Sequence, residues 1–123
     1  MPRDKLKILV VDDEPLIVEV FMEMLGQKYE VHCALSAAEV QRALEAYSYD
    51  VLITDWNMPG LNGLSLAKRL GAAGNCWVML ITGADEEAIL SVAKEGVSVH
   101  RKPIRWRALL QELQSIEQEV CLC

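Results

Sequence analysis

Short apolar runs alternate with segments of helical periodicity along the whole chain, and this alternation predicts a parallel sheet with helices on both faces. Three runs are almost continuously apolar, as strands covered on both faces should be, and we expect them to be the central strands. They are residues 6–11, 50–54 and 76–81. Two further segments, residues 29–34 and 97–101, alternate or end in polar residues, and we expect them to form the edges of the sheet.

Helical patterns fill the intervals between these strands. Pro15 is well placed to open a helix, because its missing N–H is not needed in a first turn. Other segments carry apolar residues at i, i+3, i+4 and i+7. We expect helices over residues 15–26, 62–71 and 84–94, around Val40, Ala43, Leu44 and Tyr47, and from Trp106 through Leu109, Leu110, Leu113 and Ile116 to Val120. Five strands and five helices in strict alternation predict an α/β, doubly wound parallel sheet in the flavodoxin-like strand order 2-1-3-4-5.

The composition fits a single domain over residues 1–123 and narrows the function. The chain is 52% hydrophobic and 24% charged, and no apolar stretch reaches the roughly 18 residues that a membrane-spanning helix needs. The net charge of −6 argues against general nucleic-acid binding, which needs a basic surface, although residues 100–107 are locally basic. We therefore expect neither nucleic acid nor a membrane as a direct partner.

The N-terminus and the cysteines indicate a cytoplasmic location. Asp12 and Asp13 follow the basic start before a signal-peptide apolar region of about 7–15 residues can form. The four cysteines have neither the paired spacing of a zinc site nor the density of a disulfide-rich secreted protein, so we expect reduced thiols.

Polar residues end the predicted strands at one edge of the sheet. Asp12 and Asp13 follow the first strand, Asp55 the third, Thr82 the fourth and Lys102 the fifth. Open parallel sheets bind ligands outside the carboxyl ends of the strands where the strand order reverses, and strands one and three flank that point in the order 2-1-3-4-5. We expect Asp12, Asp13 and Asp55 to converge there.

Three converging carboxylates repel one another at neutral pH unless a proton or a cation neutralises them. Mg²⁺ prefers oxygen ligands and is usually held by one or two carboxylates together with phosphate oxygens. Lys102 offers a mobile positive charge to a phosphoryl group, and Thr82 offers a hydroxyl. These residues predict that Asp55 accepts a phosphoryl group as an acyl phosphate, while Asp12 and Asp13 hold the metal.

Each of these residues taken alone has a simpler interpretation. Asp13 could cap the first helix, Thr82 could be a turn or cap hydroxyl, and Lys102 could be a solvated lysine. Their occurrence together on one edge, in an order that builds a metal and phosphate site, favours the functional interpretation.

The segments "ILVVDDEP", "LITDWNMPGLNGL", "MLITGADEEA" and "RKPI" resemble, in order and spacing, the receiver domain of two-component response regulators. "DWNMPGLNG" in particular is similar to the single-domain chemotaxis regulators, and the resemblance covers the whole chain. It implies that Asp55 is phosphorylated, that Asp13, Asp55 and the backbone carbonyl of Asn57 bind Mg²⁺, and that Asp12 holds a metal-bound water.

The resemblance further implies that Thr82 and Lys102 bind the phosphoryl group and that the Lys102–Pro103 bond is cis. A sensor histidine kinase or a histidine phosphotransfer protein would donate the group, and the chain would catalyse only its own phosphorylation and dephosphorylation. The phosphorylated form would bind a downstream protein, act on a fused output domain, or dimerise through the face formed by residues 84–94, 97–101 and the last helix.

Three other functions compete with this one. The chain could be a receiver-like interaction module whose state is independent of phosphorylation. A Mg²⁺-dependent phosphohydrolase resembling the haloacid dehalogenases would need its two acids two residues apart and a cap domain. A flavodoxin-type electron carrier would need a Ser/Thr/Gly-rich loop where "DDEP" stands.

One position departs from the family pattern. Receivers similar to this one usually carry an aromatic ring three residues before the lysine, and that ring swings inward on phosphorylation, but here the position is Val99. Either His100 takes the place of the ring through a shifted register, or the switch works without an aromatic. The second alternative is favoured, because neighbouring residues on a strand face opposite ways.

Aromatic and basic residues near the site leave further interpretations open. Trp56 could overhang the acyl phosphate or be a partly exposed loop residue, whereas Trp77 and Trp106 are expected in the core.

Arg105 and Arg107 are expected in the first turn of the last helix, where the helix dipole disfavours cations. They could contact an acidic partner or a second copy of the chain, or they could be solvated arginines whose stems cover apolar surface.

Overall fold

The computed structural model describes residues 5–55, 57–58, 61–62, 76–82 and 97–121 of the chain. Trp56, the helix expected over residues 84–94 and all but the first residue of the helix expected over residues 62–71 lie outside these ranges.

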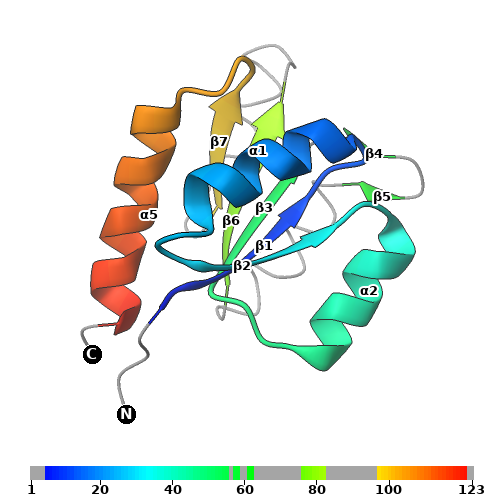
Figure 1. The fold of residues 1–123 in the computed structure, drawn as a ribbon, viewed down its shortest axis with the longest axis horizontal. Helices are drawn as coiled ribbons and strands as arrows, with labels where there is room; N and C mark the ends of the chain where they lie inside the picture. Colours follow the sequence, from blue (N-terminus) through cyan, green and yellow to red (C-terminus); the bar gives the residue numbers. More distant parts are fainter. Residues whose placement is uncertain (1–4, 56, 59–60, 63–75, 83–96, 122–123) are drawn as a thin grey trace.

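Five parallel strands form the central sheet, in the order β2-β1-β3-β6-β7 (Figure 1). They are β1 (Lys7–Val11), β2 (Glu30–Ala34), β3 (Val51–Asp55), β6 (Trp77–Thr82) and β7 (Val97–Arg101). This order confirms the predicted arrangement, with the three continuously apolar strands in the centre and the two more polar strands at the edges. Most residues of the central strands are buried, which explains why their sequences do not alternate between apolar and polar.

A short antiparallel pair of strands follows β3. It consists of β4 (Asn57–Met58) and β5 (Leu61–Asn62). Asn62 therefore belongs to a strand, although the sequence predicts a helix from residue 62. Strands of two residues are too short to show a periodic pattern of apolar positions, so the sequence gives no signal for this pair.

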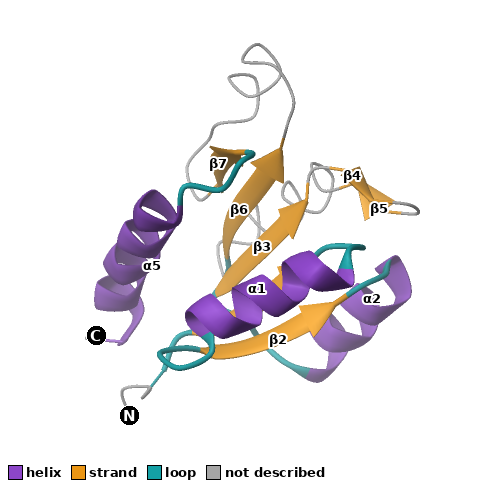
Figure 2. Cartoon of the chain, turned by 45° about the horizontal axis from the view of Figure 1, so that its top comes forward, coloured by secondary structure: helices purple, strands orange, loops and turns teal. Residues whose placement is uncertain are grey.

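Three helices lie among the described residues, namely α1 (Pro15–Leu25), α2 (Ala37–Ala46) and α5 (Trp106–Cys121). They confirm three of the five expected helices. Helices α1 and α5 cover one face of the sheet and α2 covers the other (Figure 2). Successive strand residues accordingly enter two different cores, since Ile8 and Val10 pack with α1 and α5, and Leu9 and Val11 pack with α2. Within the described part of the chain, no helix combines the length and apolar character needed to cross a membrane.

Local sequence features explain where the first two helices begin and end. Pro15 occupies a first helical position of α1, as predicted. Ser36 caps α2, because its hydroxyl oxygen accepts the Glu39 N–H at 3.2 Å. The backbone leaves the helix after Ala46 and becomes extended at Tyr47, which is 54% exposed. The expectation that Tyr47 belongs to the buried stripe of this helix is therefore wrong.

The last helix is confirmed, but Arg105 does not lie in its first turn as expected. Helix α5 begins at Trp106, so Arg105 precedes the helix and Arg107 lies in its first turn. The Trp106 ring meets Phe21 edge-on, with ring centroids 4.9 Å apart, and Trp77 packs against the same core. Both tryptophans are only partly buried, so they lie at the margin of the core rather than at its centre.

Candidate functional site

The predicted site residues lie where the carboxyl ends of β1, β3, β6 and β7 meet. The parallel register pairs Val11 with Thr54 in β1 and β3, so Asp12, which follows β1, and Asp55, which ends β3, share one edge. Asp12, Asp13 and Asp55 each place one carboxylate oxygen within 4.8 Å of the oxygens of the other two. The convergence of three acids predicted from the sequence is therefore present.

Asp12 is the buried member of this acidic cluster, with 4% of its surface exposed. Burial is the main cause that raises the pKa of Asp12 above its ordinary value of 3.8, and the charges of Asp55 and Asp13 raise it further. The Glu14 N–H donates to Asp12 Oδ1 at 3.0 Å, and this bond and the charge of Lys102 lower the pKa without cancelling the rise. A cation bound among the carboxylates would relieve the same electrostatic cost.

Asp13 does not cap the first helix. Glu14 occupies the N-cap position of α1, and no capping hydrogen bond from its side chain forms. Asp13 is exposed, and its carboxylate belongs to the acidic cluster. The capping interpretation of Asp13 is therefore wrong, and the cluster is the environment that the structure gives to this residue.

Lys102 pairs with Asp55. Its Nζ lies 3.4 Å from Asp55 Oδ1, and 42% of the Lys102 side chain and 15% of the Asp55 side chain are exposed. The Lys102 backbone N–H donates to the carbonyl oxygen of Thr82 at 2.8 Å, which continues the pairing of β6 and β7 beyond the end of β7. The Lys102–Pro103 bond is cis, as predicted. Lys102 is thus an ion-paired residue of the site rather than a lysine surrounded only by solvent.

Thr82 and Asn57 lie at the ends of elements that border the acidic cluster. Thr82 is the last residue of β6 and is buried, so it belongs to the strand rather than to a turn. Asn57 opens β4 two residues after Asp55, and it pairs with Asn62 of β5. The predicted contacts of Thr82 with a phosphoryl group and of the Asn57 carbonyl with a metal stay predictions.

The donor atoms of the acidic cluster fit a hard divalent cation. All three side chains offer carboxylate oxygens, which suit Mg²⁺ or Ca²⁺, and none offers the nitrogen or sulfur that zinc sites prefer. Mg²⁺ is commonly held by only one or two carboxylates, together with water and phosphate oxygens, so the cluster holds enough protein ligands. The cluster therefore meets the requirements of the predicted magnesium site.

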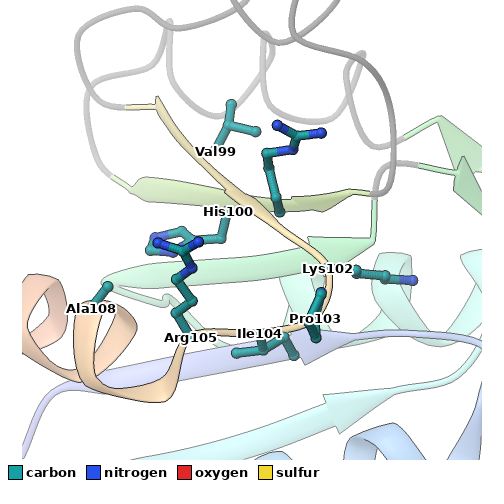
Figure 3. Close-up of a pocket in the computed structure, with 8 residues that line it drawn as sticks. Val99, His100, Lys102, Pro103, Ile104, Arg105 and Ala108 are labelled. Atoms are coloured by element: carbon teal, nitrogen blue, oxygen red, sulfur yellow. The ribbon is translucent and has the colours of Figure 1, made fainter.

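The structure decides between the two interpretations of Val99 and His100. Val99 packs with the aliphatic core on the α2 face, together with Leu80 and Val11. His100 faces α5, where its Nε2 lies 2.9 Å from Glu112 Oε1. Figure 3 shows the two side chains leaving β7 in different directions. The register is therefore not shifted, and His100 does not occupy the position of the missing ring.

Comparison with known proteins identifies relatives that span most of the chain. Residues 8–114 match the family described as the response regulator receiver domain. The transcriptional regulatory protein AruR of Pseudomonas aeruginosa is 30% identical over 122 residues, which cover 93% of this chain and 50% of AruR. The virulence sensor protein BvgS of Bordetella bronchiseptica is 40% identical over 76 residues, which cover 58% of this chain and 6% of BvgS.

A solved structure shows the same relationship. A response regulator receiver domain protein from Clostridium thermocellum is 30% identical, with a TM-score of 0.81 over 93% of this chain and 95% of that chain. The similarity thus extends over nearly the full length of a solved receiver domain, whereas the chain spans about half the length of AruR and a small part of BvgS.

Proposed function

Because the chain belongs to the response regulator receiver domains, we propose that it accepts a phosphoryl group from a phosphohistidine donor onto Asp55, with Mg²⁺, and changes its partner binding in response. Membership of this family supports a phosphorylatable relay in two-component signalling. Family membership alone does not identify the acceptor residue, the metal or the response to phosphorylation, and for these the proposal rests on the geometry of the site.

The arrangement of charges at the carboxyl edge of the sheet carries the proposal. Three carboxylates lie within 4.8 Å of one another, and a lysine Nζ lies 3.4 Å from one of them, Asp55. Asp12 is buried, whereas Asp55 is partly exposed and already beside the cation. Asp55 is therefore the carboxylate that a phosphoryl donor can reach next to a positive charge.

Phosphoryl transfer to Asp55 forms one O–P bond and breaks one N–P bond. A carboxylate oxygen of Asp55 attacks the phosphorus, and the imidazole of the donor leaves with the electron pair of the N–P bond and takes a proton from solvent. Negative charge remains on the phosphoryl oxygens. Lys102 binds one of these oxygens through Nζ, and the Thr82 hydroxyl donates to another.

The same residues provide a place for the metal. Asp12, Asp13, Asp55 and the backbone carbonyl of Asn57 would hold it, directly or through water. When bound, Mg²⁺ neutralises the negative charge that the carboxylates and the phosphoryl oxygens bring together. Asp12, being buried and hydrogen-bonded to the Glu14 N–H, keeps a fixed orientation at the base of the cluster.

In this proposal the chain acts on no separate substrate, and it catalyses only its own phosphorylation and dephosphorylation. The donor is a sensor histidine kinase or a histidine phosphotransfer protein, and the relationship to the sensor protein BvgS supports a kinase partner. The relationship to the transcriptional regulatory protein AruR supports a fused output domain or a separate downstream protein. Self-association through β7 and α5 is the further partner contact that we propose.

Cys33 and Cys76 are free thiols, which supports a cytoplasmic location.

One observation favours a second candidate function. Val99 lies among aliphatic side chains and offers no ring that could move on phosphorylation. An interaction module whose state is independent of phosphate is therefore the alternative to the phosphorylation-dependent relay.

Intact-mass measurement after incubation with acetyl phosphate, with and without Mg²⁺, tests the proposal on the native chain and on Asp55→Asn. We expect a single phosphate-sized adduct that requires Mg²⁺ and is absent from Asp55→Asn. A folded, Mg²⁺-binding protein that takes up no phosphate from acetyl phosphate or from a panel of histidine kinases would contradict the relay and favour the phosphate-independent module.

A further inference from the structure

Two side chains of β7 share one carboxylate on α5. The Ser98 hydroxyl donates to Glu112 Oε2 at 2.5 Å, and His100 Nε2 lies 2.9 Å from Glu112 Oε1. Ser98 and His100 are two residues apart and therefore lie on the same face of the strand. Each oxygen of Glu112 thus has its own partner on β7, and we call this arrangement the Glu112 clamp.

The Glu112 clamp is partly enclosed by the protein. The His100 side chain is 12% exposed and the Glu112 side chain 31% exposed. Burial by itself raises the pKa of Glu112, but the hydrogen bonds with His100 and Ser98 and the charge of His100 together outweigh burial, so the pKa is lowered. The carboxylate consequently stays ionised at neutral pH and can hold both partners. Three cations, Arg101, Lys102 and Arg105, line the same hollow as His100. Figure 3 shows Lys102 and Arg105 beside this stretch of β7.

The residue that directly follows β7, the strand held by the Glu112 clamp, is the cation of the acidic site. Lys102 follows His100 by two residues, and Lys102 Nζ lies 3.4 Å from Asp55. Among the strands that the structure describes, β7 lies at the edge of the sheet and pairs with β6 alone, so this pairing supports it from one side. Figure 3 shows His100 directed toward the start of α5 and Lys102 directed away from it.

We propose that Glu112 is a positioning residue, which holds Ser98 and His100 and thereby fixes the end of β7 so that Lys102 lies beside Asp55. The inference rests on the proposed function, because it assumes that Lys102 assists phosphoryl transfer to Asp55. Glu112 does not touch the reacting atoms, so its effect on the reaction passes through Lys102.

The rate of phosphorylation by acetyl phosphate, followed by intact mass in the full chain, tests this role. We expect Glu112→Ala to slow phosphorylation about 5-fold, because displacing a group that positions the reaction costs rate even when the group lies outside the site. Glu112→Gln keeps the shape of the side chain and one of the two oxygen acceptors, while its amide N–H can donate to the Ser98 oxygen, so it should restore the rate to within about 2-fold of the native value. Glu117→Ala removes another α5 carboxylate, one that pairs with Lys28 rather than with β7, and should leave the rate unchanged.

A double-mutant cycle separates positioning from simple stabilisation. If Glu112 acts through Lys102, Glu112→Ala should cause no further loss of rate in a Lys102→Ala background. All rates are compared at a temperature where circular dichroism shows every variant folded. If Glu112→Ala does not fold, His100→Leu replaces it, and His100→Gln serves as the conservative variant.

Two results would overturn the proposal while leaving the relay function intact. One is a native rate in Glu112→Ala, and the other is an equal loss of rate in the native and Lys102→Ala backgrounds. Absence of phosphorylation in the native chain is a separate outcome, because it would overturn the proposed function and the positioning role together.

Discussion

Neutralising Asp12 should stabilise the metal-free protein. Asp12 is buried beside two other carboxylates, and its pKa is raised mainly by burial. A carboxyl group whose pKa is raised in the folded state stabilises the fold below its ordinary pKa of 3.8, and this contribution is lost as the pH rises through the raised value. At neutral pH the ionised Asp12 therefore costs stability. Asp12→Asn removes the charge and keeps an oxygen that can accept the Glu14 N–H.

The size of this effect follows from the geometry of the acidic cluster. At 4.8 Å, two unit charges repel by about 3.5 kcal/mol at an effective dielectric constant of 20 and by about 0.9 kcal/mol in bulk water. The attraction of Asp12 to Lys102 ranks between its repulsions from Asp55 and Asp13, so it offsets about one of the two. Because the cluster is open to solvent at Asp13, we expect a net gain of about 1–2 kcal/mol, or about 4–8 °C in Tm.

Thermal unfolding in EDTA and in Mg²⁺ measures the effect. In EDTA, Asp12→Asn should melt above the native protein, whereas Glu23→Gln, an exposed carboxylate on α1, should change Tm little. In Mg²⁺ the advantage of Asp12→Asn should shrink or reverse, because only the native cluster gains the full binding energy of the metal. Lowering the pH toward the raised pKa of Asp12 should likewise reduce the stabilisation by Mg²⁺. An Asp12→Asn protein that melts below the native protein in EDTA would refute the electrostatic argument.

Three further predictions concern single side chains. Lys102→Met should slow phosphorylation by acetyl phosphate about 100-fold, because it removes the charge beside the acceptor, whereas Mg²⁺ should still raise the Tm of this variant. A native phosphorylation rate, measured by intact mass, would contradict the role of this lysine. Leu25 is 0% exposed, so Leu25→Ala should lower the free energy of unfolding, measured in urea, by about 2–5 kcal/mol. Leu16 on the same helix is 73% exposed, so Leu16→Ala should change it by less than about 0.5 kcal/mol. Burial raises the pKa of Cys76 to about 12, whereas Cys33 is exposed. At pH 8 iodoacetamide should therefore modify Cys33 and spare Cys76 in the native protein, which peptide mapping measures. Equal modification would indicate that Cys76 is accessible and acidic.

The sequence predicts the sheet well because burial leaves a local signal there. Strands covered on both faces are continuously apolar, so the three central strands stand out along the chain, and the more polar segments fall at the edges. The convergence of Asp12, Asp13 and Asp55 then follows from topology, because parallel strands in this order bring their carboxyl ends together.

The sequence is less informative about the residues at which a helix begins and ends. The periodic pattern assigns Tyr47 to the apolar stripe of a helix, but the backbone leaves the helix one residue earlier. Asp13 is a suitable capping residue by type, yet the chain reaches the first helical turn through Glu14. Both errors arise because the local pattern does not contain the backbone angles at the helix end.

The contacts of Glu112 show a second limit, because they depend on packing between distant segments. In the sequence, Glu112 is one of several polar residues among the apolar positions of α5, and nothing distinguishes it from Glu117 or Glu119. Only the packing of α5 against the edge strand shows that Glu112 meets Ser98 and His100. The sequence does carry one sign of this contact, because β7 has two polar residues at alternate positions, and polar side chains facing a covering helix need a polar partner there.

The alternation of side chains along β7 connects the acidic site with the helix α5. Ser98 and His100 contact Glu112, Val99 packs in the opposite core, and Lys102 extends to Asp55. Because Lys102 follows His100 by only two residues, we expect a displacement of the Lys102 backbone to change the contacts that hold His100. Val99 has no long side chain that can swing between two positions, whereas the contacts with Glu112 give the strand beside the site a polar link to α5. That link lies on the strand and helix through which we propose that the chain meets its partners, so we expect a relay in this chain to work without the aromatic residue.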